Sequence, residues 1–196
     1  MGTRVEFWEI PKANIKRAVI DDFAQMKNCY DSIGKEFPED IDYDLLEELE
    51  RIVNPERLFE EFDPDQIDEL IALYIGDYCD YGPGKVSEIQ GTSMLNIRHY
   101  IDDQNAVNRK CSVATRQLWD FILIGRSIIE STKFKVADPV FRYCFLTEAE
   151  CQALFQDLVN NFDTSRVIDF NRKPGIGSVI QAIRNKKGEG ILITVA

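Results

Sequence analysis

Gly190-Ile191-Leu192-Ile193-Thr194-Val195 is the stretch that decides the fold, because it is apolar almost without interruption and rich in β-branched residues. Such a run is typical of a strand that is buried on both faces of a sheet. Pro174 before it can open a helix, and Gly188 can end that helix. The apolar positions at helical spacing are Ile176, Val179, Ile180 and Ile183. We therefore predict a helix from about residue 174 that leads into a buried strand.

Two other segments complete the predicted sheet. Residues 4–10 combine aromatic and β-branched side chains and stop before Pro11, which predicts a first strand. Residues 139–146 predict another strand, and Thr147 with Glu150 has the spacing of a capping box that starts a helix. The predicted fold class is α+β, a small mixed sheet that includes the N- and C-terminal strands and is packed by several amphipathic helices.

Helical periodicity dominates the rest of the chain. Apolar residues recur at helical spacing over residues 12–31, 41–53 and 112–131, and the last of these segments predicts a central helix. Asn54-Pro55 and Asp63-Pro64 each place a capping side chain before a proline, which predicts two further helix starts. The sequence does not indicate whether residues 82–112 are ordered.

Acidic residues are concentrated in one part of the chain. Residues 21–81 contain twenty Asp and Glu against four Lys and Arg, a net charge of −16, whereas the whole chain carries −11. The other residues are therefore mildly basic, at +5. An acidic surface repels nucleic acid and anionic lipid and attracts basic proteins, which favours a binding role. The alternative is that these carboxylates are only the solvated side of surface helices.

Length and composition indicate one domain with a substantial core, at 196 residues and 44% hydrophobic positions. Within it we expect an acidic helical portion at about residues 12–81 and a sheet-plus-helix portion at about residues 86–196, joined through Gly82-Pro83-Gly84. No targeting or membrane-spanning segment is recognisable, so a soluble, cytoplasmic protein is expected, without membrane association. Five irregularly spaced cysteines are expected to be reduced and mostly buried. They are Cys29, Cys79, Cys111, Cys144 and Cys151.

No motif predicts catalysis or a bound metal or cofactor. His99 is the only histidine, and no spacing gives it a nucleophile or carboxylate partner. Zinc patterns are excluded by the single histidine and the absence of a C-x-x-C pair. Residues 40–51 begin like a calcium loop but have Leu45 where glycine is required and Arg51 where glutamate is required. Gly82-Pro83-Gly84-Lys85 lacks the Walker spacing.

One weak anion site is predicted before the helix at residue 174. Two basic side chains and free backbone N–H groups converge there on a helix N-terminus. An ordinary capped turn is the alternative. The residues concerned are Arg172, Lys173, Gly175, Gly177 and Ser178.

The order of these segments resembles that of the small bacterial YfbM-like proteins and their relatives. The resemblance rests on a strand directly after Met1-Gly2, an acidic helical middle, residues 142–150 (Arg-Tyr-Cys-Phe-Leu-Thr-Glu-Ala-Glu), and a helix that runs into residues 188–193. It implies a cytoplasmic α+β protein and favours an immunity role. It implies no catalytic residue.

The predicted function is a non-catalytic protein-binding inhibitor, an immunity protein that neutralises a basic toxin through its acidic surface. One alternative is a nucleic-acid mimic that antagonises a DNA- or RNA-binding protein. A second is a small enzyme or anion-binding protein with a cleft near His99 or Lys173. The predicted partner-binding residues are Asp44, Glu47, Glu48, Glu60, Glu61, Tyr74, Asp77, Tyr78, Asp80 and Tyr81.

Overall fold

The structure of the chain is a computed structural model, which describes some but not all of its residues. The described residues are 3–10, 17, 20–21, 23–38, 43–63, 66–67, 87–89, 95–127, 132–134, 142–162 and 173–195. The predicted junction at residues 82–85, the start of the strand at residues 139–141 and most of the helix after Asp63 lie outside this set.

The described strands form one sheet. They are β1 (Arg4–Ile10), β2 (Ser87–Glu88), β3 (Leu95–Asn96), β4 (Arg142–Thr147) and β5 (Gly190–Val195). The strand order is β2-β1-β5-β4, and β3 also pairs with β1. The α+β class and both predicted terminal strands are confirmed. Every pairing among these strands is antiparallel, so this sheet is not mixed.

Strand β5 lies between β1 and β4 and is buried along its whole length. Ile193 is paired with Phe7 and Cys144, and all three belong to the main core. The next residue along, Leu192, is paired with Phe145 and points to the opposite face, where both side chains are also buried. The prediction of a strand buried on both faces is therefore confirmed.

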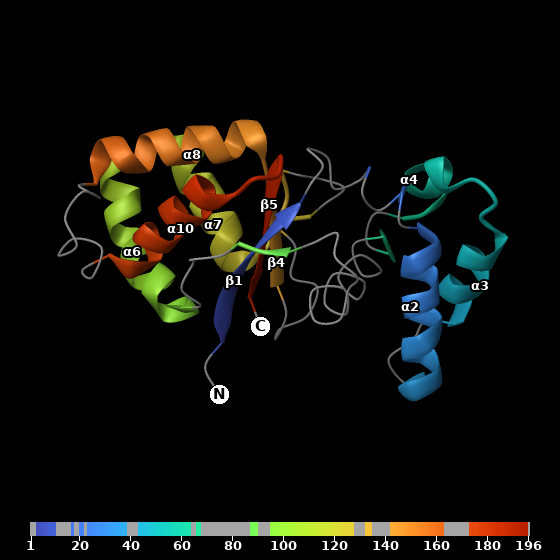
Figure 1. Ribbon diagram of the computed structural model, residues 1–196. Coiled ribbons are helices and arrows are strands. Elements are labelled where there is room, and N and C mark those ends of the chain that lie inside the picture. The colour runs from blue at the N-terminus through green and yellow to red at the C-terminus, as the bar shows by residue number, and fades with distance from the viewer. Residues whose placement is uncertain are drawn as a thin grey trace.

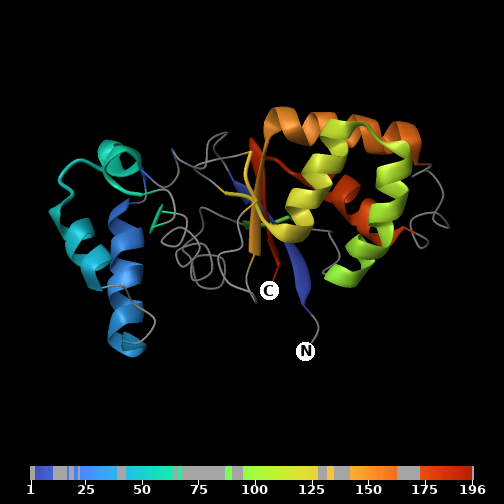
Figure 2. The same ribbon diagram turned by 180° about the vertical axis from the view of Figure 1, so that it is seen from behind.

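Among the described residues, four helices cover one face of the sheet (Figures 1 and 2). They are α6 (Ile97–Lys110), α7 (Val113–Ile124), α8 (Glu148–Asn161) and α10 (Pro174–Asn185). Helix α10 packs against both α6 and α8, and its four predicted inward residues are all buried. The predicted capping box at the start of α8 is present, with each of Thr147 and Glu150 accepting a backbone N–H of the other.

Helix α7 is shorter than predicted. It was expected to continue to about residue 131, but it ends at Ile124 because Gly125 has φ of 106° and ψ of 159°. Only glycine adopts this region without strain. Leu118, Trp119 and Phe121 are buried in the main core as expected of a central helix, whereas Ala114 is exposed instead of facing inward.

The remaining described helices gather on the other side of the sheet (Figure 1). They are α2 (Phe23–Glu36), α3 (Tyr43–Arg51), the 3-10 turn η2 (Pro55–Arg57) and α4 (Leu58–Glu61). We call the described residues 23–63 the acidic lobe. The helix predicted to end near residue 31 continues to Glu36, and Asn54 caps η2 as predicted by accepting the N–H of Glu56.

The acidic lobe has its own buried side chains, which are not part of the main core. Because β1 precedes the lobe in sequence and pairs with β5, the lobe is an insertion between two strands of the same sheet. No helix within the described residues is both long and apolar enough to cross a membrane. The buried side chains of the lobe and of the residues that follow it are Phe23, Tyr30, Leu49, Leu58, Phe62 and Ile67.

Candidate functional site

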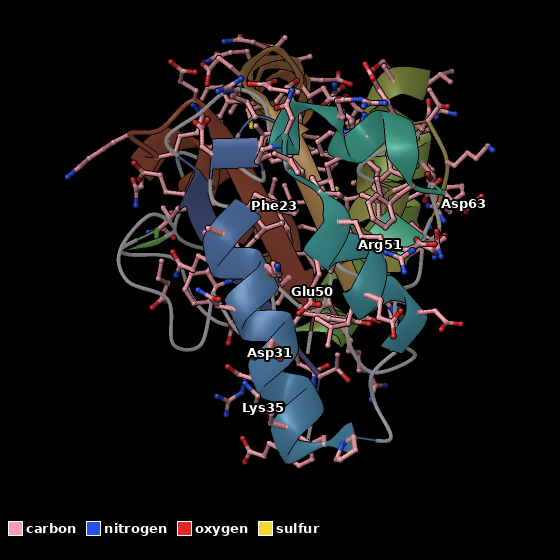
Figure 3. The ribbon with its side chains drawn as sticks, turned by 90° about the vertical axis from the view of Figure 1, so that its right-hand side faces the viewer. Phe23, Asp31, Lys35, Glu50, Arg51 and Asp63 are labelled. Atoms are coloured by element: carbon pink, nitrogen blue, oxygen red, sulfur yellow. The ribbon has the colours of Figure 1, made fainter. Side chains whose placement is uncertain are left out.

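The acidic lobe presents carboxylates at its surface. Figure 3 views the lobe with the sheet behind it, and it shows Asp31 and Lys35 on α2, Glu50 and Arg51 on α3, and Asp63 beyond α4. Four predicted partner-binding residues are exposed there, namely Asp44, Glu47, Glu48 and Glu60. The side chain of Glu61 and the residues Tyr74, Asp77, Tyr78, Asp80 and Tyr81 lie outside the described residues, so their predicted role stays a prediction.

Three basic side chains of the lobe form ion pairs with acids three or four residues away in the chain. Lys35 pairs with Asp31 one turn earlier in α2. Arg51 Nη2 lies 3.5 Å from Glu47 Oε2, and Arg57 Nε lies 3.9 Å from Glu60 Oε2. Each of these pairs is neutral as a whole, so the negative charge of the lobe comes from its other carboxylates.

Arg17 connects the acidic lobe to the residues just before it. Its guanidinium contacts Asp21 at 2.8 Å and Glu56 at 2.6 Å. In contrast, Glu48 and Glu50 on α3 make no ion pair with any residue that the structure describes. Their carboxylates are exposed. The surface of α3 therefore keeps negative charge that the described part of the chain does not balance.

A small notch opens beside these carboxylates. It has a volume of about 190 Å³ and is lined by Glu48, Arg51 and Ile52 from α3 and the residue after it, and by Phe62 beyond α4. Phe62 is 8% exposed and Ile52 is half-buried, so they form an apolar floor between charged rims. Val53 follows Ile52 and is 96% exposed.

A second polar cluster joins α6 to the start of α10. Asp103 on α6 is 2% exposed, and its Oδ2 accepts the backbone N–H of Ile176 at 3.0 Å. Its Oδ1 lies 3.3 Å from Lys173 Nζ. Burial raises the pKa of Asp103 above its usual value, although the N–H of Ile176 and the Lys173 ammonium act in the opposite direction.

Close approach of the two helices is what makes this cluster possible. A Cβ added at Gly175 would lie 3.0 Å from His99 O and Tyr100 Cα, so a side chain there would require the two helices to shift. Trp119 Nε1 donates to Tyr100 O at 3.2 Å, which fixes α6 on α7. Burial also raises the pKa of the Tyr100 hydroxyl, which interacts with Ser178.

These contacts change the interpretation of the predicted anion site. The N–H of Ile176 is taken by the carboxylate of Asp103, and Gly177 N donates to Lys173 O. Gly175, Gly177 and Ser178 are buried, so an external anion has no access to them. The helix N-terminus binds a carboxylate, as expected physically, but the carboxylate belongs to this chain. Arg172 lies outside the described residues.

His99 lies on α6 with its side chain exposed, as expected of a helix-surface histidine. Among the described residues, its side chain makes no hydrogen bond or ion pair with an acid or a thiol. The cysteines Cys111, Cys144 and Cys151 are free and buried. Burial raises the pKa of Cys111 to about 11 and of Cys151 to about 12, and it also raises that of Cys144. These thiols are therefore poor nucleophiles at neutral pH.

An ion pair that the sequence did not predict joins Arg126, just after α7, to Glu150 on α8. Arg126 Nη2 and Nη1 contact the two carboxylate oxygens of Glu150 at 2.7 and 3.0 Å, and Nη1 also donates to Phe145 O. Arg126 N donates to Tyr143 O, so one residue satisfies two carbonyls along the edge of β4. Burial alone would raise the pKa of Glu150, but the Arg126 guanidinium and the hydrogen bonds from Thr147 together outweigh it and hold that pKa below its usual range. Its contacts indicate a structural role.

The sequence contained a partial signal for the buried position of Asp103. It contained almost none for the notch or for the pair between Arg126 and Glu150. Tyr100, Asp103 and Val107 share one face of α6, so a charged residue stands at an inward position between two apolar ones. The notch and the Arg126 pair join residues from different elements, at separations that no periodic pattern links.

Within the described residues, no three His, Cys, Asp or Glu side chains come together as metal ligands. Comparison with known proteins shows no matching family model, no matching curated protein and no matching solved structure. The resemblance to YfbM-like proteins therefore stays a prediction. The contacts and charges described above are what bear on function.

Proposed function

We propose that this protein is a non-catalytic, cytoplasmic binding protein that inhibits a basic partner protein, as an immunity protein neutralises a toxin. The observation that carries the proposal is the exposed carboxylate surface of α3 and α4, where nearby bases are engaged in local pairs. A concentrated negative field of this kind attracts a basic protein and speeds their encounter.

Two further features support binding over catalysis. The histidine is exposed on a helix, and the described thiols are buried with raised pKa values. The lobe is also inserted in the fold as a separate group of helices, away from the main core. A partner can therefore contact the lobe without disturbing the sheet.

Capture of a partner from the lysate of the source cells tests the proposal. The immobilised chain is exposed to lysate at low and at moderate salt, and retained proteins are identified by mass spectrometry. We expect a stoichiometric basic protein that is lost as salt rises, because exposed charge pairs are screened over about 10 Å at 0.1 M salt. Retention of no protein under either condition would contradict a binding role.

A matched pair of variants then tests which surface binds. Glu47→Lys with Glu60→Lys reverses two charges on the acidic lobe, and Glu88→Lys with Asp102→Lys reverses two exposed charges elsewhere. The lobe variant should associate with the captured partner about tenfold more slowly, measured by surface plasmon resonance, and the other variant nearly normally. Equal slowing by both would mean that net charge matters and the lobe surface does not. Displacement of the partner by DNA would favour nucleic-acid mimicry.

A further inference from the structure

The notch between α3 and Phe62 has the size of a site for a single side chain. Its volume of about 190 Å³ is below the roughly 300–1,000 Å³ of pockets that hold small-molecule ligands. At about 30 Å³ for each water molecule in the liquid, it corresponds to about six waters. The notch is too small for a typical substrate or cofactor, but it has room for one long side chain from another protein.

The lining determines the chemistry of that side chain. Ile52 and Phe62 offer apolar contact to a hydrocarbon stem, and Glu48 at the rim offers a carboxylate to a cationic end. Arg51 also lies at the rim, but its guanidinium is directed to Glu47, so its charge is already partly neutralised. With Asp44, Glu47 and Glu50 exposed on the same helix, the local field disfavours an anion.

We propose that the notch receives an arginine side chain of a basic partner protein. Arginine combines a stem that packs on apolar surface with a planar guanidinium that can pair in two-pronged fashion with Glu48. Arginine is also common at the energetic centre of protein interfaces, where neighbouring apolar residues exclude water. Val53, which is exposed and follows the lining residue Ile52 in the chain, can supply such a residue. This inference rests on the proposed function and names the anchor point of the same surface.

Peptide titration tests the notch without knowledge of the partner. The full chain, labelled with ¹⁵N, is titrated with N-acetyl-glycyl-arginyl-glycinamide and followed by NMR. We expect saturable shifts of the amide signals of Arg51, Ile52, Val53 and Phe62. The same peptide with glutamate in place of arginine should leave those signals unchanged. Shifts spread evenly over the lobe would overturn the notch as the site. A third peptide has lysine in place of arginine, and equal affinity for it would overturn the choice of arginine.

A charge-matched pair of variants sharpens the test. Glu48→Gln removes the rim carboxylate and should weaken peptide binding about threefold, the effect of losing one exposed ion pair. Glu36→Gln removes one exposed charge from the end of α2 and should leave binding unchanged. Equal weakening by the two variants would show that only net charge acts.

The captured partner separates failure of the notch from failure of the proposed function. If a basic partner is captured and Glu48→Gln binds it as tightly as the original chain, the arginine anchor is wrong and the binding role stands. If the peptide occupies the notch and no partner is captured, the anchor stands and the inhibitory role does not.

Discussion

Asp103 shows how one buried residue decides whether a helix end is open to a ligand. Its carboxylate is 2% exposed, accepts a hydrogen bond from Ile176 and faces Lys173. A buried carboxylate without such partners would be strongly destabilising. The same contacts that make Asp103 tolerable close the N-terminus of α10 to external anions.

The buried carboxyl group of Asp103 is expected to make the stability of the protein depend on pH. An unfolded aspartate has a pKa of about 3.9, and burial raises the folded value. Folding therefore favours the protonated acid, so the stability from this group is fully present below about pH 3.9 and is lost as pH rises through the folded pKa. Urea unfolding of the original chain and of Asp103→Asn should show that the original loses stability relative to the variant as pH rises above about 4.

Asp102→Asn is the control, because Asp102 is the exposed neighbour on the same helix. Its stability difference from the original chain should change little over the same pH range. A difference for Asp103→Asn that moves in the opposite direction would show that Lys173 and the Ile176 N–H outweigh burial.

At the scale of elements, Arg126 closes the edge of strand β4. Its backbone N–H and guanidinium donate to the carbonyls of Tyr143 and Phe145, and it lies over the ring of Phe121 at 5.0 Å. Unsatisfied edge carbonyls invite pairing with another chain. Arg126 also pairs with Glu150, which belongs to the capping box of α8. Its one side chain therefore connects α7, β4 and α8.

Loss of Arg126 is therefore expected to be costly. Arg126→Ala leaves Glu150 partly buried and unpaired and should lower the free energy of unfolding by about 2–4 kcal/mol. Glu150→Gln keeps a capping side chain and should cost less. Arg57→Ala removes an exposed pair and should cost under about 1 kcal/mol. Urea unfolding measures all three, and similar values for Arg126→Ala and Arg57→Ala would contradict the role assigned to Arg126.

At the scale of the whole molecule, the buried side chains that the structure describes do not all belong to one cluster. The main core joins the sheet to α6, α7, α8 and α10, and the acidic lobe buries Tyr30, Leu49 and Leu58 separately. Groups that share few contacts open independently in many proteins. The lobe can therefore serve as a binding surface while the sheet maintains the fold.

Hydrogen exchange tests this independence. Leu49 is fully buried in the lobe, and Leu49→Ala should destabilise the lobe by about 2–5 kcal/mol. Amide exchange followed by mass spectrometry should speed up in α2, α3 and α4 and stay unchanged in β5. Leu154→Ala, at a fully buried position of α8, should speed exchange in the main core. Uniform acceleration by Leu49→Ala would show one cooperative unit.

The local features that the sequence predicted correctly are those whose cause is local. Strand β1, the capping box at Thr147 and the cap at Asn54 depend on neighbouring residues, so propensity and spacing were sufficient. Helix α6, over residues 97–110, was not predicted. A charged residue, Asp103, stands at an inward position of this helix and weakens the periodicity of its apolar residues. The end of α7 was misplaced because Ile128 and Ile129 prolong the apolar pattern beyond Gly125.

By itself, the sequence determined the class of fold, the buried character of β5 and the acidic charge of residues 21–81, because composition and periodicity act over a few turns of chain. Only the tertiary structure decided the strand order, the pairing of Asp103 with the start of α10, and the notch between Ile52 and Phe62. Each of these joins residues whose separation along the chain carries no pattern, and their contacts exist only after the elements have packed.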